Sequence, residues 1–450
     1  MANTYLSRTQ GTGNRQIFTY SAWIKRSDLG EGFLFQGYTS TSSFVHIKFD
    51  GNNKLQVFGK TGGSDQMDLV TSRVFRDTGA FYHVIVAIDT TQSTDTNRVK
   101  VYINGVQETS FSTTSYPSVN ANLEINVSGY TNYIGSQYGS QAYYGGLMSY
   151  VAFVDGTAEL PIIFGETDAT TGEWKIKTSI TPTSGWGNNG FLILKDGNTI
   201  TDQSSNSNNF SLGGGTLTNT EDCPSNVFAT LNGLNVGGGA STLSNGNTTY
   251  SLSNYSYNTR STLGMPSGKF YWEQKQSGTN TRIGLITSGF TIDLDTDNAN
   301  AYYGGSGGGG VYLLMSNSAT SWQYTNNNTS RNTGMYTTAI ASSASDILMG
   351  AVDVDAGKLW IGVNGVWFNS GNPATGSNAT LTFTNSSGDE LQIYAGHGTS
   401  SARVSSFNFG NGYFGTTQIS SEGTNASGIG KFEYDVPTGF TALSTKGLNE

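Results

Sequence analysis

The chain has 450 residues, which suits two domains of about 200 residues each better than a single one. Only 12% of the residues are charged, so the polar surface must come from Asn, Ser and Thr together with 60 Gly. This composition favours short strands joined by many turns, and it disfavours long helices. The formal net charge is −9 and Lys and Arg are scattered, which argues against a nucleic-acid partner.

The single cysteine, Cys223, excludes an internal disulfide framework and a cysteine-rich metal site. The N-terminal residues lack the apolar run of a signal peptide, so we expect synthesis in a cytoplasm without secretion. No run approaches the roughly 20 apolar residues of a membrane-spanning helix. We therefore expect no membrane insertion.

Alternating and apolar runs in the first half predict β-hairpins. Apolar and polar residues alternate over 45–49, which predicts a half-buried strand, and the polar residues 50–53 predict the turn that follows it. Residues 82–88 form an apolar run that predicts a buried strand. The alternating residues 99–103 end at Asn104-Gly105, the dipeptide best suited to a two-residue type I′ turn.

The second half repeats this pattern. Residues 347–354 are apolar, and 358–363 return from a turn and end at Asn364-Gly365. The similarity to the hairpin at Asn104-Gly105 has two open explanations, a shared fold plan or convergence of hairpins on similar residues. Both explanations predict antiparallel β-structure.

Few apolar residues occur between about 202 and 220, which predicts a linker. We therefore expect a first domain over 1–200, a linker over 201–221 and a second domain over 222–450. The expected fold class is all-β, with two antiparallel β-sandwich domains of jelly-roll type in tandem.

Several segments carry resemblances to known families. In the first half they are 18–26, 82–86, 101–105, 133–135 and 145–147. In the second half they are 267–273, 283–285, and 350–353 running through 364–365. On these segments, residues about 1–200 resemble a laminin-G-like (concanavalin-A-like) domain, and residues about 222–445 resemble a SPRY domain. Both resemblances imply β-sandwiches, an architecture that hosts lectins, adhesion modules and some glycosidases.

The tandem and its ending, residues 437–443, resemble a group of tailed-bacteriophage particle proteins. The resemblance implies a virion component, such as a tail fibre, spike or surface-appendage subunit that mediates attachment to the host. The implied partners are other virion proteins and a host-surface glycan or protein receptor, with a homo-oligomer, most often a trimer. Two alternatives stay open: a glycan-degrading depolymerase, and an assembly or adaptor protein with no host ligand.

The sequence predicts no enzymatic activity. Hydrolases related to this fold commonly carry a Glu-x-Asp-x-x-Glu strand, which is absent here. Asp353 and Asp355 share one face of a strand, but they lie where SPRY domains have a turn-closing Asp. We expect these two carboxylates to be structural.

One acidic stretch is a candidate metal site. Asp293, Asp295 and Asp297 alternate along the chain, as carboxylates that wrap a structural Ca²⁺ can do. The stretch departs from an EF-hand at its sixth and twelfth positions, so a solvated acidic loop is the preferred interpretation. We expect no other cofactor.

Two aromatic, amide-rich stretches are candidate ligand sites. Tyr138, Tyr143 and Tyr144 lie among Gln and Ser, and Trp322 and Tyr324 flank Gln323. Sugars bind to aromatic faces with hydrogen bonds from amides, and both stretches supply these groups. The same composition also suits wet protein interfaces, and some of these rings could belong to a core.

Overall fold

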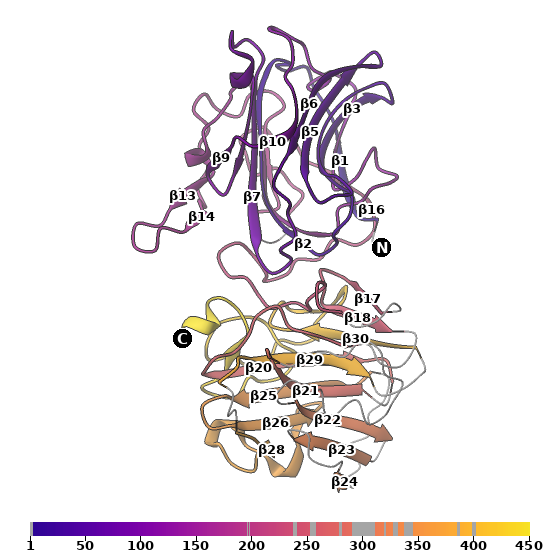
Figure 1. Cartoon of the computed structure of the whole chain (residues 1–450), viewed down its shortest axis with the longest axis vertical. Helices are drawn as coiled ribbons and strands as arrows, with labels where there is room; N and C mark the ends of the chain where they lie inside the picture. Colours follow the sequence, from indigo (N-terminus) through magenta and orange to yellow (C-terminus); the bar gives the residue numbers. More distant parts are fainter. Residues whose placement is uncertain are drawn as a thin grey trace. The chain divides into compact units, whose positions relative to one another are not determined.

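The structure is a computed structural model. It describes the chain except for residues 1–2, 196, 198, 237–240, 253–257, 279–280, 290–310, 319–320, 327–331, 337–344, 385–387 and 398–401. Of residues 241, 252, 258, 281, 311–318, 321–326, 332–336 and 397 it describes the backbone alone. The chain divides into two compact units, Met1–Asn219 and Thr220–Glu450 (Figure 1).

Strands dominate both units. The described residues contain no α-helix, only short 3₁₀ segments: η1 (Asp95–Asn97), η2 (Pro161–Ile163), η3 (Phe368–Ser370), η4 (Pro373–Thr375) and η5 (Gly447–Asn449). No helix in the described part of the chain is long and apolar enough to cross a membrane. The all-β prediction is confirmed.

The first unit is an antiparallel β-sandwich of two main sheets and a small hairpin. The eight-stranded sheet runs, in spatial order, β10 (Phe111–Ser115), β6 (Ser64–Thr71), β5 (Leu55–Thr61), β4 (Ser43–Phe49), β3 (Gly32–Ser40), β11 (Thr131–Ile134), β1 (Tyr5–Thr9) and β16 (Ser211–Gly214). The six-stranded sheet runs β15 (Phe191–Ile193), β12 (Gly146–Asp155), β2 (Ile17–Arg26), β7 (Phe81–Asp89), β8 (Val99–Ile103) and β9 (Val106–Glu108). The hairpin is β13 (Gly165–Thr167) with β14 (Trp174–Ile176).

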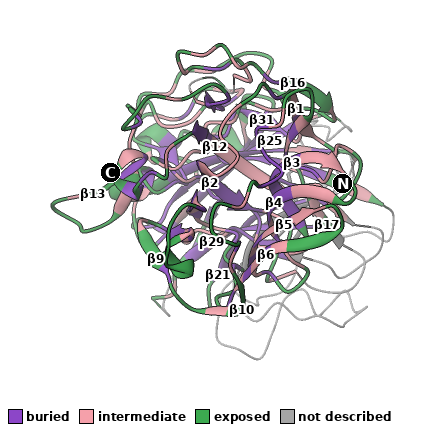
Figure 2. Cartoon of the chain, turned by 90° about the horizontal axis from the view of Figure 1, so that it is seen from above, coloured by how far each residue is buried: buried purple, intermediate pink, exposed green. Residues whose placement is uncertain are grey.

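The core of the first unit lies between its two main sheets. Phe35, Ile47 and Val57 are inward-facing cross-strand neighbours in the eight-stranded sheet, and Tyr20 and Phe153 enter the same cluster from the six-stranded sheet. Side chains alternate between faces along each strand, so alternate residues of β4 and β5, such as Phe44 and Phe58, face outward. Figure 2 shows buried residues along β2 and exposed residues in the loop beside β13.

The predicted hairpins form as expected. Residues 45–49 lie in β4, 82–88 in β7 and 99–103 in β8. Both Asn104 (φ 49°) and Gly105 (φ 78°) have positive φ, as a type I′ turn requires, and Ile103 pairs with Val106 across the turn.

The corresponding turn in the second unit has the same geometry. Asn364 and Gly365 have φ values of 48° and 83°. In each turn the Asn side-chain oxygen also accepts a hydrogen bond from a neighbouring strand, from His83 N to Asn104 (2.8 Å) and from Ile347 N to Asn364 (2.9 Å). The two hairpins therefore share a side-chain anchor as well as a turn type.

The predicted linker over 201–221 is wrong for most of its length. Ser211–Gly214 forms β16 and pairs with β1, and Phe210 is buried in the core of the first unit. The buried Asp202 carboxylate accepts hydrogen bonds from Leu192 N (2.9 Å) and Asn208 N (2.7 Å), among others. Polar side chains anchor this segment, so its low content of apolar residues wrongly predicted a linker. The two units divide after Asn219.

The second unit also pairs two main sheets. The larger contains, in spatial order, β17 (Ser241–Ser244), β18 (Thr249–Leu252), β30 (Arg403–Asn408), β20 (Lys269–Gln276), β25 (Ile347–Asp353), β26 (Lys358–Val363) and β27 (Val366–Trp367), with β28 (Leu381–Thr382) on β26 and β33 (Thr441–Ala442) parallel to β20. The smaller contains β19 (Asn258–Arg260), β29 (Leu391–His397), β21 (Thr281–Thr287), β22 (Val311–Ser318), β23 (Ser321–Asn326) and β24 (Asn332–Tyr336). A separate pair is β31 (Tyr413–Phe414) with β32 (Thr417–Gln418).

A buried carboxylate ties the C-terminal segment of this unit to its larger sheet. Glu273 on β20 accepts hydrogen bonds from the backbone N–H groups of Glu433 (2.9 Å) and Tyr434 (2.8 Å). It also accepts from Tyr271 Oη and Asn408 Nδ2, both at 3.1 Å. Burial is the largest influence on this group and raises the pKa of Glu273 to about 7.

Candidate functional site

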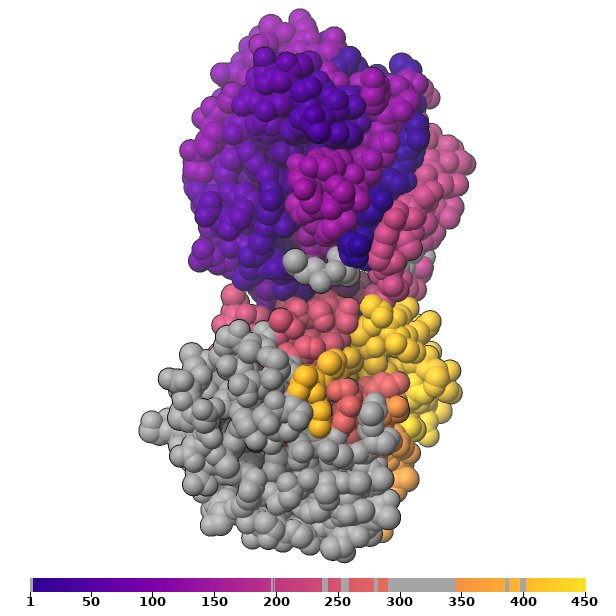
Figure 3. All heavy atoms as spheres, turned by 90° about the vertical axis from the view of Figure 1, so that its right-hand side faces the viewer, coloured from indigo at the N-terminus to yellow at the C-terminus, as the bar shows by residue number. Residues whose placement is uncertain are grey.

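A polar pocket opens in the first unit at the edge of the eight-stranded sheet. Its volume is about 770 Å³. Three adjacent strands, β11, β1 and β16, form its floor, and Figure 3 shows the indigo N-terminal strand beside the pink residues that precede and form β16. We call it the tyrosine–asparagine pocket. It is lined by Tyr5, Ser7, Arg8, Thr9, Gly11, Thr131, Tyr133, Asn188, Asn189, Ser207, Asn208, Asn209 and Ser211.

Strand register places the floor residues side by side. Ser7 is the cross-strand neighbour of Tyr133 on one side and of Ser211 on the other, and Thr9 lies beside Thr131. All five are on the outward face, because Leu6, next to Ser7, points into the core. The floor therefore presents four hydroxyl-bearing side chains together with one aromatic ring.

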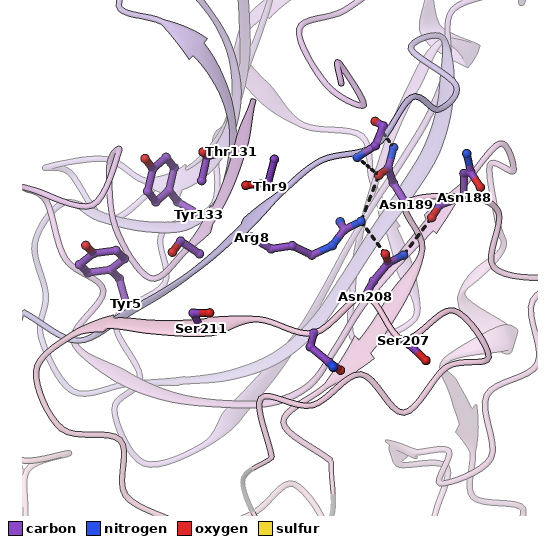
Figure 4. Close-up of a pocket in the computed structure, with 13 residues that line it drawn as sticks. Tyr5, Arg8, Thr9, Thr131, Tyr133, Asn188, Asn189, Ser207, Asn208 and Ser211 are labelled. Atoms are coloured by element: carbon purple, nitrogen blue, oxygen red, sulfur yellow. Dashed lines mark hydrogen bonds between the residues drawn. The ribbon is translucent and has the colours of Figure 1, made fainter. Parts of the chain in front are cut away.

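A second tyrosine ring closes one end of the floor. The ring centroids of Tyr5 and Tyr133 are 6.1 Å apart with planes tilted by 50°. A Cβ at Gly213 would lie 2.0 Å from Cε2 of Tyr5, so only glycine at this position lets the Tyr5 ring lie against β16. Figure 4 shows the two rings at one end of the pocket and the asparagine side chains at the other.

Five hydroxyl groups that line the pocket are available to a ligand. Within the described part of the chain, the side-chain hydroxyls of Ser7, Thr9, Thr131, Ser207 and Ser211 make no hydrogen bond to protein. Each hydroxyl can donate one hydrogen bond and accept others. The pocket thus offers both donors and acceptors beside two aromatic rings.

Arg8 and two asparagines build the opposite wall. Arg8 Nη2 donates to Asn189 Oδ1 (3.1 Å) and to Asn208 Oδ1 (2.7 Å) (Figure 4). Asn189 Nδ2 donates to Gly11 O (2.8 Å), and Asn208 Nδ2 donates to Asn188 O (2.9 Å). Since both amides are engaged within the protein, Asn189 and Asn208 shape the wall rather than supply free hydrogen-bonding groups.

Two buried carboxylates hold this wall from behind. Asp155 accepts from Asn189 N (3.0 Å) and Asn14 N (2.8 Å), and Asp202 accepts from Asn208 N. Burial raises the pKa of Asp155, while hydrogen bonds from backbone N–H groups oppose that shift. Burial lowers the pKa of Arg8, and the charges of Asp202 and Asp155 oppose that change. The positive charge of Arg8 therefore faces negative charge inside the protein.

The structure brings Tyr143 against the pocket and places Tyr138 farther along the sheet, against a residue outside the pocket lining. The Tyr143 ring lies 6.3 Å from that of Tyr5, and the Tyr138 ring lies 5.4 Å from that of Tyr38 on β3. The expectation for Tyr144 is wrong: its side chain packs against the core of the first unit and its hydroxyl is buried without a partner. That burial raises the pKa of Tyr144 well above its usual range.

The other candidates cannot be placed in a site. Trp322 and Tyr324 lie on β23, whose backbone alone is described. Asp293, Asp295 and Asp297 lie outside the described residues. Among described residues, no three His, Cys, Asp or Glu side chains are grouped so that they could hold a metal ion.

The second-unit carboxylates considered for catalysis have structural partners. Asp353 Oδ1 accepts from Ala356 N (2.9 Å), and its other oxygen lies 3.3 Å from Lys269 Nζ. Asp355 accepts from Gly268 N at 3.0 Å. These contacts close the turn after β25, as expected.

Ser21 and His83 form a buried hydrogen bond in the first unit, but its direction does not suit a serine nucleophile activated by a histidine base. Trp174 Nε1 donates to His83 Nδ1 (2.9 Å), so the ring proton of neutral His83 sits on Nε2, which is 2.8 Å from Ser21 Oγ. Burial lowers the pKa of His83 to about 3, which keeps the ring neutral. His83 therefore donates to Ser21 instead of accepting its proton, as a general base would have to do.

Sequence reasoning missed the lining of the pocket itself. Its residues come from 5–11, 131–133, 188–189 and 207–211, and only strand pairing brings them together. A signal was present in the alternation of Tyr5, Ser7 and Thr9, a short strand with three outward polar or aromatic residues.

Comparison with known proteins supports the fold of the first half. Residues 2–160 match the family described as the concanavalin A-like lectin/glucanases superfamily. This range contains Tyr5, Ser7 and Tyr133 but not the asparagine wall. No curated protein matches the chain.

Several solved structures are similar at low identity. A native heptameric SAP-like pentraxin from Limulus polyphemus is 17% identical, with 35% of this chain and 72% of that chain covered and a TM-score of 0.26. Domains LG4-5 of the mouse laminin alpha1 chain are 9% identical, with coverages of 97% and 92% and a TM-score of 0.29. The SPRY domain of human HERC1 is 14% identical, with coverages of 39% and 96% and a TM-score of 0.27. At TM-scores this low, none of these likenesses defines the function.

Proposed function

We propose that the first unit binds carbohydrate in the tyrosine–asparagine pocket. The observation that carries the proposal is the pairing of the Tyr5 and Tyr133 rings, 6.1 Å apart, with a floor of unengaged hydroxyls. Aromatic rings cover the apolar faces of sugars, and polar groups placed around them fix the sugar's orientation. The family description of residues 2–160 includes lectins, which agrees with this role.

The proposed ligand is uncharged. Arg8 is the one charged side chain among the described residues that line the pocket, and Asp155 and Asp202 stand behind it. The local charge therefore does not favour an anionic sugar, and no lining carboxylate would hold a cationic one.

The proposed activity is binding without cleavage. Glycoside hydrolysis usually needs two carboxyl groups placed on either side of the scissile bond. No Asp or Glu belongs to the described lining of the pocket, and Asp155 and Asp202 are occupied by backbone N–H groups. The depolymerase alternative thus lacks its catalytic groups at this site.

The setting that we propose is attachment of a bacteriophage particle to a host-surface glycan. Its support is the tandem of two β-sandwich units and the resemblance of residues 437–443 to phage particle proteins. In this setting the second unit, or an oligomer, would contact other virion proteins. An adaptor without a host ligand would instead bind no glycan at all.

The proposal is tested by glycan-array screening of the purified full chain, followed by titration calorimetry with the best neutral oligosaccharide. Tyr133→Ala should weaken binding at least tenfold, about 1.4 kcal/mol, because it removes a ring that the sugar would cover. Tyr130→Ala is the matched control, since Tyr130 is exposed and does not line the pocket.

Two results would count against the proposal. Wild-type protein that binds no glycan would favour the adaptor role, and a Tyr133→Ala variant with wild-type affinity would exclude this pocket. Incubation with host envelope polysaccharide provides the activity control. Release of oligosaccharide that is lost on changing one carboxylate would overturn the binding-only role.

A further inference from the structure

An aromatic row extends from the pocket across the outward face of the eight-stranded sheet. We define it as Tyr5, Tyr133, Tyr38, Phe44 and Phe58, one ring on each of the neighbouring strands β1, β11, β3, β4 and β5 (β1, β3 and β5 are labelled in Figure 1). Strand register places all five on one face. Ser7, Tyr133, Gln36, His46 and Phe58 are successive cross-strand neighbours, and the other three rings lie two residues from members of this set.

The rings form a nearly continuous path. Tyr133 lies 6.1 Å from Tyr5 and 6.3 Å from Tyr38, and Phe44 lies 5.8 Å from Phe58. All five side chains are half-buried, so each still exposes part of its surface. Beneath them the buried His46 ring stacks against Phe44 and Phe58, at 5.4 and 5.2 Å, which supports that end of the row.

A loop runs beside the row and fixes two of its members. Tyr143 contacts Tyr5, and Tyr138 contacts Tyr38, as described above. Tyr138 N donates to Gln36 Oε1 on β3 at 2.7 Å. Tyr138 (φ 38°) and Ala142 (φ 48°) adopt left-handed backbone conformations, which cost energy and persist only where surrounding contacts hold them. The loop is therefore held in place along the face.

Two lysines near the row are paired with carboxylates. Lys48 forms an ion pair with Glu31, and Lys60 Nζ lies 3.3 Å from Asp65. Gln36, Ser7 and Thr131, the polar residues between the rings, are neutral. Asp68, the cross-strand neighbour of Phe58, accepts a hydrogen bond from Gln56 Nε2 (2.8 Å) and forms no ion pair within the described part of the chain. This carboxylate disfavours an anionic partner, and the rest of the face offers aromatic surface and neutral polar groups.

We propose that this face binds a linear, uncharged oligosaccharide that crosses the strands from the pocket at Tyr5 and Tyr133 to Phe58. The inference rests on the proposed function and specifies its ligand as a chain rather than a single sugar. Strands in a sheet lie about 4.8 Å apart, so the four intervals from β1 to β5 span about 19 Å. This length accommodates several sugar units.

Titration of the full chain with neutral oligosaccharides of defined length tests the proposal. The probes are linear glucan, mannan and xylan oligomers of one to six units. For the series that binds, affinity should rise at least tenfold between two and five units. Phe58→Leu and Phe44→Leu keep apolar contact but remove the ring, and each should remove most of that gain while leaving disaccharide binding unchanged. Tyr133→Ala should weaken every length.

The outcomes separate this inference from the proposed function. Equal affinity for disaccharide and pentasaccharide, or no effect of Phe58→Leu and Phe44→Leu on the pentasaccharide, would overturn the extended site while leaving sugar binding in the pocket intact. Failure of every oligomer and every arrayed glycan to bind would overturn both. Thermal unfolding midpoints within about 2 °C of wild type would show that the leucine variants remain folded, and Tyr130→Ala again serves as the control.

Discussion

Replacing Gly105 with alanine should destabilise the first unit more than the same change at Gly63, a turn glycine with open space around it. Gly105 has a φ of 78°, so an alanine there would carry the penalty of a left-handed conformation, about 1–2 kcal/mol. The added Cβ would also lie 2.5 Å from Cε3 of Trp174, inside the ring's van der Waals surface. The Trp174 side chain must therefore move.

Movement of Trp174 adds a second cost. Its Nε1 donates to Nδ1 of the fully buried His83, and loss of that bond would leave a buried acceptor unpaired, about 1–3 kcal/mol. The total loss in the free energy of unfolding is then about 2–5 kcal/mol. Gly105 thus supports both its own turn and the attachment of the β13–β14 hairpin.

Two matched glycines separate these costs. Gly63, at φ 87°, has open space where a Cβ would lie, so Gly63→Ala should lose only the free energy needed to hold alanine in a left-handed conformation. Gly365, at φ 83°, would meet the Tyr434 ring at 3.2 Å, a contact that a small ring shift relieves. Differential scanning calorimetry and urea unfolding of the three variants provide the measurement. Equal losses for Gly105→Ala and Gly63→Ala would refute the role assigned to Trp174.

The remaining predictions concern pH and the pocket wall. Burial lowers the pKa of both His46 and His83 to about 3, so between pH 6.5 and 3 the folded first unit binds fewer protons than the unfolded chain. The free energy of unfolding of this unit should therefore fall as pH drops through that window, by about 1.4 kcal/mol per histidine per pH unit. Burial raises the pKa of Glu273 to about 7, so between pH 4.5 and 7 the folded second unit binds more protons than the unfolded chain. The stabilisation that Glu273 gives the second unit is therefore full below pH 4.5 and is lost as pH rises through 7. Glu273→Gln should remove this pH dependence. Calorimetry at pH 7 and pH 5 should show the two units shifting in opposite directions, and parallel shifts would contradict both assignments. Asp202→Ala leaves buried N–H groups unpaired, so it should cost about 3 kcal/mol and move the first proteolytic cut into residues 202–209; an unchanged cleavage pattern would show that Asp202 does not hold this wall.

Local patterns predicted the hairpins well because their determinants are local. Alternation over 45–49 and the dipeptides Asn104-Gly105 and Asn364-Gly365 each encode geometry within a few residues, and the structure has β4 and two turns with positive φ there. The Asn side-chain anchors to His83 and Ile347 were not predictable in this way, because they depend on which strand lies alongside.

Segments that depend on distant partners were predicted poorly. Residues 202–214 appeared to be a linker because they contain few apolar side chains, yet Asp202 and Phe210 fix them to the first unit. Tyr144 lies in the same aromatic, amide-rich stretch as Tyr138 and Tyr143, but its side chain packs against the core. Composition identifies a ligand-suited loop, while strand pairing decides which of its rings face outward.

The central claim, that the first unit binds a neutral carbohydrate between Tyr5 and the asparagine wall, is tested most directly by a crystal structure of the full chain with the tightest neutral oligosaccharide. The expected result is a sugar ring against Tyr5 and Tyr133, with hydrogen bonds to the hydroxyls of Ser7, Thr131 or Ser211. A sugar bound elsewhere in the chain, with this pocket filled only by solvent, would contradict the account.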